Sequence, residues 1–275
     1  MKNILLLVHD DVGQEARLQA ALDVTRAVDG HLRCLDVTQL PVAYGTYSPP
    51  AGAMIVEGDL QAMLLEDEYA REGENRQRLE ARLAGEGVSW DWTDITGDMA
   101  EVVVAMADLA DLIVLNRKLD GFPAPDARGI AGAVVTRAHR PVLAVPDKLT
   151  SFNIGGRALI AWDGSPSAAA AMRASVPLLA LASEVRLLCV ETDDGGGLFD
   201  DAASYLSRYG IHAELRRVPA GTRSPADVIL GECGAWDAGW CVMGAYGHSR
   251  LRETLFGGVT RRMLTDCSIP LILGH

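Results

Sequence analysis

Short apolar runs alternate with longer amphipathic stretches along the whole chain. One run covers residues 4–8 and leads into a helical pattern over residues 14–28; another covers residues 157–162 and leads into a helical pattern over residues 167–182. Apolar runs without polar alternation are typical of parallel strands that are covered on both faces. The pattern therefore predicts an α/β fold with a doubly wound sheet.

The order of these elements repeats in the second half of the chain. After the first strand and helix, each half shows a second strand, a later helix with its strand, and a final Pro-led strand. The matching segments are 31–37 and 184–190, 99–107 and 224–233, 111–116 and 239–244, and 139–145 and 268–273. The repeat predicts two tandem doubly wound domains, residues 1–148 and 156–275, each with a five-stranded, mainly parallel sheet flanked by helices. Residues 146–156, which include Pro, Asn and two Gly, are the expected linker.

The first half carries an insertion that the second half lacks. Residues 39–57 contain Pro41, Gly45, Pro49 and Pro50, which predicts a loop. The loop is either a lid over a site or a surface excursion without one. Residues 60–83 follow as a long charged helix with a solvated face.

Composition narrows the range of partners. The 275 residues are 49% hydrophobic and 23% charged, with a net charge of −12. An acidic chain is poorly suited to an extended nucleic-acid surface, which needs Lys and Arg to neutralise phosphates. No segment approaches the roughly 20 apolar residues of a membrane span. The five cysteines have no CxxC spacing and are expected to be reduced thiols in a cytoplasmic protein.

Glycines cluster in one strand-to-helix segment, residues 239–260. After Gly239, which precedes the strand, they are Gly244, Gly247, Gly257 and Gly258, followed by Val259 and Thr260 at the head of a helical pattern. Glycines let backbone N–H groups approach a phosphate, and a helix N-terminus adds donors and a favourable dipole. The alternative is an ordinary turn followed by a helix cap, and spacing alone leaves both open.

Asp163 follows the first strand of the second half, and Gly164, Ser165 and Pro166 come next. Ser165 and Pro166 are explained by a helix N-cap and first helical position. Asp163 falls on the edge where ligands of doubly wound sheets bind. Its carboxylate is a candidate acceptor for a ribose hydroxyl or an adenine amine, and a turn residue is the alternative.

The glycine pattern is neither a Walker A loop nor a dinucleotide fingerprint, because it lacks Gly-Lys-Ser/Thr and no GxGxxG follows the first strand. The spacing Gly-x2-Gly-x9-Gly, at Gly244, Gly247 and Gly257, together with Asp163-Gly-Ser, resembles the universal stress protein family. The resemblance covers both halves and so implies a tandem universal stress protein. It is more specific in the second half.

The resemblance implies binding of ATP or a related adenylate (ADP or AMP), with Mg²⁺ as a candidate companion ion. In this chain Asp163 and the backbone of Val190 would hold the adenosine, and Gly244 would lie against the ribose. The residues implied for the phosphates are Gly247, Gly257, Gly258, Val259 and Thr260, with His248 as a neighbouring loop residue. His248 is a poor metal candidate, because no second His or Cys lies at ligand spacing, and no metal ligand set is predicted.

Two departures from the family pattern limit this carry-over. Gly258 stands where the family usually has Ser or Thr, which removes a hydroxyl donor, so either the ATP contact is weaker or another adenylate is preferred. In the first half Asn116-Arg-Lys-Leu119 stands where Gly-x2-Gly is expected, and His9 or Asp10 replaces the strand-end Asp. We therefore expect one nucleotide per chain and a first half that is structural or takes a different ligand.

Three functions from different classes follow. The favoured one is a stress-response regulatory protein that binds an adenine nucleotide; the others are a slow ATP hydrolase or nucleotidyl transferase, and a structural interaction module. No catalytic residues are identified, although Asp163 and Glu191 could hold Mg²⁺. The family also implies pairing of last strands, here residues 142–145 with 271–273, and a further homodimer as an option.

Overall fold

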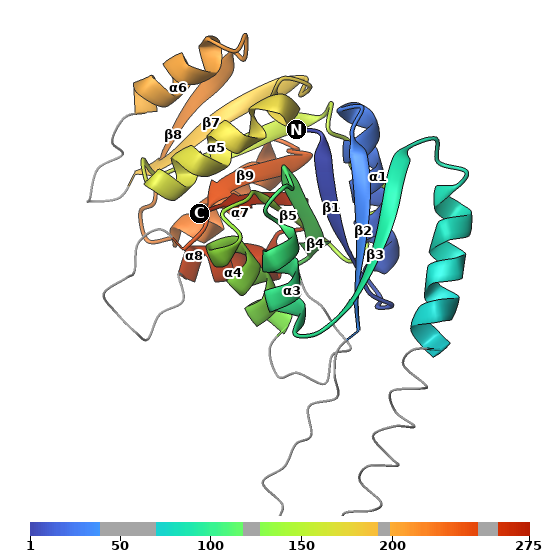
Figure 1. The fold of residues 1–275 in the computed structure, drawn as a ribbon. Coiled ribbons are helices and arrows are strands. Elements are labelled where there is room, and N and C mark those ends of the chain that lie inside the picture. The colour runs from blue at the N-terminus through green and yellow to red at the C-terminus, as the bar shows by residue number, and fades with distance from the viewer. Residues whose placement is uncertain (39–69, 118–126, 192–198, 247–257) are drawn as a thin grey trace, which may run out of the picture.

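The computed structural model describes residues 1–38, 70–117, 127–191, 199–246 and 258–275. Both halves are doubly wound and share one ten-stranded sheet (Figure 1). The first half contains β1 (Asn3–Val8), α1 (Gln14–Ala27), β2 (His31–Thr38), a helix over residues 70–83, β3 (Ser89–Thr96), α3 (Met99–Met106), β4 (Leu112–Asn116), α4 (Ala127–Arg137) and β5 (Val142–Val145). The second half contains β6 (Arg157–Trp162), α5 (Pro166–Leu179), β7 (Glu184–Glu191), α6 (Phe199–Ser207), β8 (Ala213–Pro219), α7 (Pro225–Ala235), β9 (Trp240–Gly244), α8 (Gly258–Asp266) and β10 (Leu271–Gly274).

The strand order is β3-β2-β1-β4-β5-β10-β9-β6-β7-β8. Strands within each half are parallel. At the centre β5 and β10 run antiparallel, with Leu143 opposite Ile272. The α/β fold predicted from the repeat is therefore confirmed. In each half the winding direction reverses beside the first strand, between β1 and β4 or between β6 and β9, which is where such sheets bind ligands.

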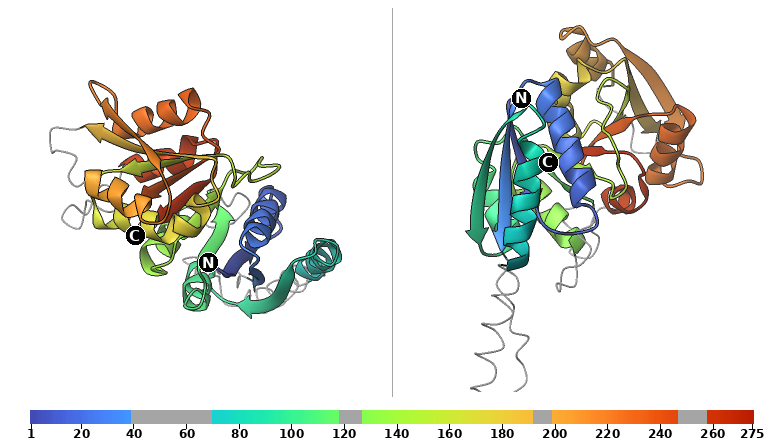
Figure 2. Two further views of the ribbon diagram at one scale, coloured as in Figure 1. Left: turned by 90° about the horizontal axis from the view of Figure 1, so that it is seen from above. Right: turned by 90° about the vertical axis from the view of Figure 1, so that its right-hand side faces the viewer.

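Helices cover both faces of the sheet (Figure 2). One apolar core contains side chains of α1, the 70–83 helix, α5 and α6, and the other contains side chains of α3, α4, α7 and α8. Each core includes residues of both halves, so the two repeats are packed as one three-layered body. Since apolar burial is the main favourable term in folding, this arrangement stabilises the halves jointly.

The expected linker is part of this body. Phe152 and Ile154 are buried in the first core, and the Phe152 ring lies edge-on to Trp240 with 6.0 Å between centroids. The Phe152 N–H donates to the Asp23 carboxylate on α1 at 2.8 Å. The segment thus connects α1 to the centre of the second half.

Local sequence explains the helix starts. Asp98, Ser165 and Ser224 each accept a hydrogen bond from a backbone N–H three residues on, and Pro166 and Pro225 take the first helical position. Within the described residues no helix is both long and apolar enough to cross a bilayer. All five cysteines are buried and none forms a disulfide.

Candidate functional site

Three neighbouring strands of the second half end side by side. Trp162 of β6 pairs with Cys189 of β7, and Ala161 pairs with Met243 of β9. Asp163 is therefore level with Val190, and Gly244 lies one residue lower on the other side. Adjacent strands are about 4.8 Å apart, so the structure brings these three predicted residues together at the point where the winding reverses.

Asp163 is exposed and belongs to a tight turn. Its Oδ1 accepts from the Ser165 N–H at 2.9 Å, and Gly164 between them has φ of +75°, a conformation that suits glycine. Ser165 then caps α5 by accepting from the Ala168 N–H at 3.1 Å. The turn hydrogen bond fixes the Asp163 carboxylate at the rim and leaves the group in contact with solvent.

Val190 and Glu191 form the end of β7. Val190 is half-buried and packs on the second core, whereas Glu191 is exposed. An apolar side chain beside a carboxylate suits a flat base with polar edges. Asp163 and Glu191 are carboxylates at the ends of adjacent strands.

Gly244 is required by packing. A Cβ on Gly244 would lie 2.5 Å from the Ala168 nitrogen and 2.8 Å from the Ser167 Oγ. The end of β9 therefore touches the first turn of α5, and this contact explains the glycine without any ligand. Gly244 supports the site by letting the strand end and the helix start meet.

The start of α8 lies next to the end of β9. The Tyr246 N–H donates to the Oγ1 of buried Thr260 at 3.4 Å, and Tyr246 has φ of +58°. Val259 is half-buried against the second core. Gly258 begins α8 and is exposed, and apart from its neighbours and its own helix no atom of the described residues lies within 4 Å of where a Cβ would be. Packing against the described residues therefore does not require glycine at 258, in contrast to 244.

Three predicted residues, Gly247, His248 and Gly257, lie outside the described residues. The described part of the chain contains no group of three or more His, Cys, Asp or Glu side chains that could hold a metal ion. The rim residues that the structure does place supply a carboxylate, an apolar wall and a helix N-terminus. Such a set can bind a base, a sugar and a phosphate.

The matching edge of the first half is closed by a buried polar network that the sequence did not reveal. Arg17, which is fully buried, forms an ion pair with Asp11 at 3.0 Å and donates to the Asn116 side chain and to the His9 carbonyl at 2.8 Å. The Asn116 Nδ2 in turn donates to Asp147 at 3.0 Å. These groups come from the ends of β1, β4 and β5 and from α1, so they occupy the switch point itself.

The two edges correspond residue by residue. Asp11 and Ser165 are each the third residue after the first strand, and Arg17 and Ala171 are each six residues further on. A Cβ at Gly13 would lie 1.7 Å from the Asn116 Nδ2, so a glycine on the helix side admits a large side chain from the strand. In the second half the small and the large residue are exchanged. Ser167 takes the place of Gly13 on the helix side, and Gly244 takes the place of Asn116 on the strand.

His9 occupies the place of Asp163. Burial lowers the pKa of His9 from 6.5 to about 4, and the positive charges of Arg17 and Arg71 add to this while Asp11 opposes it. Its imidazole is therefore neutral near pH 7 and cannot act as the carboxylate acceptor that Asp163 provides. Burial likewise lowers the pKa of Arg17, and the charge of Asp11 and the hydrogen bond to it oppose the change.

Fold and rim together define a doubly wound α/β protein in which, among the described residues, buried polar side chains fill one switch point and not the other. No protein-family model matches the chain. The chain is 26% identical to the universal stress protein Slr1230 of Synechocystis sp., over 99% of both proteins. A universal stress protein from Archaeoglobus fulgidus matches 98% of this chain with 97% of its own, at a TM-score of 0.73 and 16% identity. A protein of unknown function from Pseudomonas aeruginosa matches all of this chain with 92% of its own, at a TM-score of 0.61 and 16% identity.

The chain is thus similar over its full length to universal stress proteins, and the resemblance indicated by its glycine motif is confirmed. The similarity to the solved structures supports the α/β fold. Neither comparison assigns a ligand to particular residues of this chain.

Proposed function

We propose that this protein is a stress-response regulatory protein that binds ATP or a related adenine nucleotide through its second half. The proposal is carried by the difference between the two switch points. At one, Asp163, Val190 and the start of α8 surround an open edge; at the other, Arg17 and Asn116 fill the equivalent place. One nucleotide per chain is the expected stoichiometry.

The proposed nucleotide contacts extend from the strand ends to the start of α8. Asp163 accepts from the ribose or the adenine amine, and the Val190 backbone and side chain hold the base. Gly244 lies against the ribose, and Gly247, Gly257, Gly258 and Thr260 bind the phosphates, with His248 and Val259 beside them. Mg²⁺, where present, is held by the phosphates with Asp163 or Glu191.

Calorimetry with ATP, ADP, AMP and cyclic nucleotides tests this function. We expect one site per chain and an increase in the free energy of unfolding of about 2.7 kcal/mol at a ligand concentration 100 times the Kd. Gly247→Val should abolish both effects, because a side chain there obstructs the phosphate approach. Gly231→Val, in α7 where no atom lies within 4 Å of the added Cβ, is the matched control. Absence of binding by every adenine nucleotide at millimolar concentration contradicts the proposal.

Gly258 offers a second test that strengthens binding. A serine fits there without contact and adds a hydroxyl donor, and a hydrogen bond to a charged group contributes roughly 1.5–3 kcal/mol. Gly258→Ser should therefore raise ATP affinity by about tenfold or more and leave unfolding unchanged. Equal ATP affinity in both proteins would place the phosphates elsewhere.

We further propose a cytoplasmic location and persistence of the β5–β10 pairing in solution. Because this pairing uses the last strand of each half, any homodimer would form through other surfaces. Small-angle scattering that returns the mass of a single chain would rule the homodimer out.

A further inference from the structure

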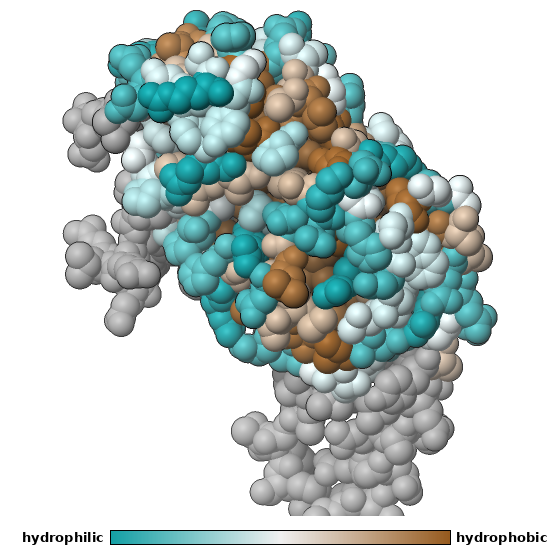
Figure 3. All heavy atoms as spheres, turned by 45° about the horizontal axis from the view of Figure 1, so that its top comes forward, coloured by the Kyte–Doolittle hydropathy of each residue, from teal (hydrophilic) through white to brown (hydrophobic). Residues whose placement is uncertain are grey.

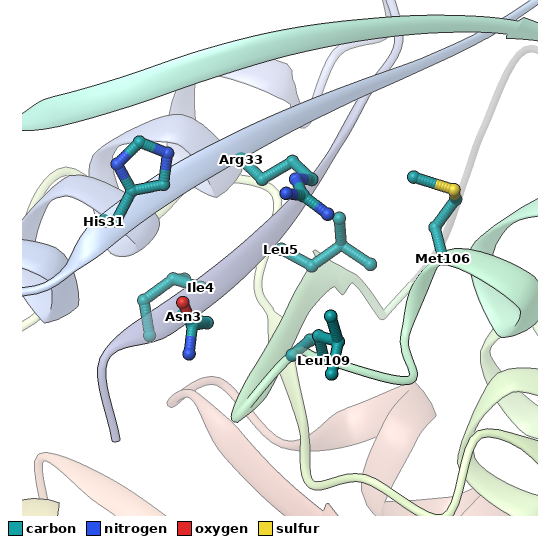
Figure 4. Close-up of a pocket in the computed structure, with 8 residues that line it drawn as sticks. Asn3, Ile4, Leu5, His31, Arg33, Met106 and Leu109 are labelled. Carbon is teal, nitrogen blue, oxygen red and sulfur yellow. The ribbon is translucent and has the colours of Figure 1, made fainter.

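A cavity of about 250 Å³ lies at the opposite end of the first half, near the amino ends of its strands. Figure 4 shows Arg33, Leu5, Met106 and Leu109 around a common space. The residues that line it are Asn3, Ile4, Leu5, His31, Arg33, Met106, Leu109 and Ala110. This end of the molecule comes forward in Figure 3, where apolar residues form several groups among hydrophilic ones. The walls are thus apolar on one side and cationic on the other.

The second half has the same strand framework at this position. Arg33 on β2 lies opposite Asp91 on β3 and pairs with it at 3.3 Å. Arg186 on β7 lies opposite Glu214 on β8 and pairs with it at 2.8 Å. Each cation therefore extends from the same point of its sheet and is held by a carboxylate from the edge strand.

An aromatic ring covers the cation in the second half only. The Arg186 guanidinium lies 4.2 Å from the centroid of the Trp236 ring, and Arg157 donates to the Trp236 carbonyl at 3.1 Å. The Arg186 side chain is consequently 13% exposed, compared with 40% for Arg33. The second half thus shows that an aromatic ring fits over the arginine at this position of the sheet.

Turn length explains why the first half lacks the ring. Four residues, including Trp236, separate buried Cys233 from buried Ala238 at the end of α7. Only two residues separate buried Ala107 from buried Ala110 at the end of α3. The shorter turn places Leu109, which is 81% exposed, beside Arg33. Arg33 therefore has an apolar side chain at its side and no ring over it.

We propose that this cavity binds a small planar aromatic molecule, with its ring stacked on Arg33 as the Trp236 ring stacks on Arg186. Leu5, Met106 and Leu109 supply the apolar wall, and the carboxylate of Asp91 fixes the guanidinium. The volume suits one or two fused rings, since cavities for drug-sized ligands begin near 300 Å³. The site is separate from the nucleotide edge, which lies at the other end of the strands.

Indole, the ring system of Trp236, is the first probe. Titration of methyl-labelled protein, followed by NMR, should shift the methyl signals of Leu5, Met106 and Leu109 with a millimolar Kd. Phenol and cyclohexanol form a matched pair of aromatic and saturated rings, and phenol should bind more tightly. Arg33→Leu keeps an apolar side chain and removes the cation, so it should weaken indole binding by about two- to fivefold.

Leu109→Trp is the decisive variant. The substitution adds an indole side chain at position 109. We expect this side chain to occupy the cavity and to abolish binding of added indole. Leu181→Trp replaces another exposed leucine and should leave indole binding unchanged. Shifts at other methyl groups, or unaltered binding to Leu109→Trp, would overturn the site. Equal affinity for phenol and cyclohexanol, or no effect of Arg33→Leu, would overturn the stacking.

Discussion

The two switch points of this protein share a backbone plan and differ in what fills it. In the second half Asp163, Val190 and Gly244 end three adjacent strands, and among the described residues no large buried side chain fills the space between them. In the first half Arg17, fully buried, links Asp11 to Asn116 across the same position. The doubly wound repeat thus keeps its fold when buried side-chain interactions fill the switch point.

The closed edge also shows why closure requires several coordinated substitutions. A buried guanidinium is tolerated only when carboxylates and carbonyls surround it, and here Asp11, the His9 carbonyl and Asn116 come from the ends of β1 and β4. Its Nε has no hydrogen-bond partner among the described residues. The open edge needs fewer such partners, since its polar groups contact solvent.

The largest expected effect comes from removing the anion of the closed edge. Asp11→Ala leaves Arg17 as a buried charge without its ion-pair partner, and breaking such a pair costs about 3–5 kcal/mol. Urea denaturation should show this loss in the free energy of unfolding. A loss below about 1 kcal/mol, typical of an exposed pair, would mean that the network does not stabilise the first half.

Acid should destabilise the closed edge next. His9 has a pKa of about 4 in the folded protein, compared with 6.5 when unperturbed, so between these values the unfolded chain binds more protons. The free energy of unfolding should fall as pH drops from 6.5 to 4, by as much as about 3 kcal/mol from this group. His9→Asn should flatten that part of a stability-versus-pH curve, and an unchanged slope would contradict the burial of a neutral imidazole.

At the open edge, Gly244→Ala is expected to have a smaller but clear effect. The added Cβ would lie 2.5 Å from the Ala168 nitrogen, and such overpacking costs about 1–3 kcal/mol. Gly258→Ala, where no atom lies within 4 Å, is the control and should match the parent or exceed it slightly. If both variants unfold alike, the contact between β9 and α5 does not require glycine.

The smallest effect should come from the cap of the open edge. Ser165→Ala removes the acceptor for the Ala168 N–H and should cost about 1 kcal/mol, well below Asp11→Ala at the matching position of the first half. Thermal unfolding of the two variants, measured side by side, gives the comparison. Equal losses would show that the ion pair adds nothing beyond a helix cap.

Much of this molecule could be predicted without coordinates. Continuous apolar runs predicted inner strands such as β1 and β9, and Ser165-Pro166 predicted the start of α5. The edge strands β3 and β8 were missed, because their residues are largely exposed or half-buried and so carry no apolar run. The 60–83 helix prediction is met over residues 70–83, and its earlier part lies outside the described residues.

The candidate site was predictable only in part. Asp163, Val190 and Gly244 were chosen correctly as neighbours, since strand ends of a parallel sheet share an edge. The reason for glycine at 244 was not visible, because it depends on Ala168, far away in the sequence. Placement of Gly258 and Thr260 at the start of α8 agrees with the motif, and their contact with a nucleotide stays a prediction.

The strand–helix alternation, the tandem repeat and the glycine motif of the second half were visible in the sequence, because period and spacing are local properties. The way in which the first switch point is filled, and the aromatic ring over Arg186, became visible only in the folded protein. Arg17, Asp11, Asn116 and Asp147 form one network only after the sheet has brought three strand ends and a helix together. Contacts between residues so far apart in the sequence produce no periodic pattern along the chain, so they can be recognised only in the folded structure.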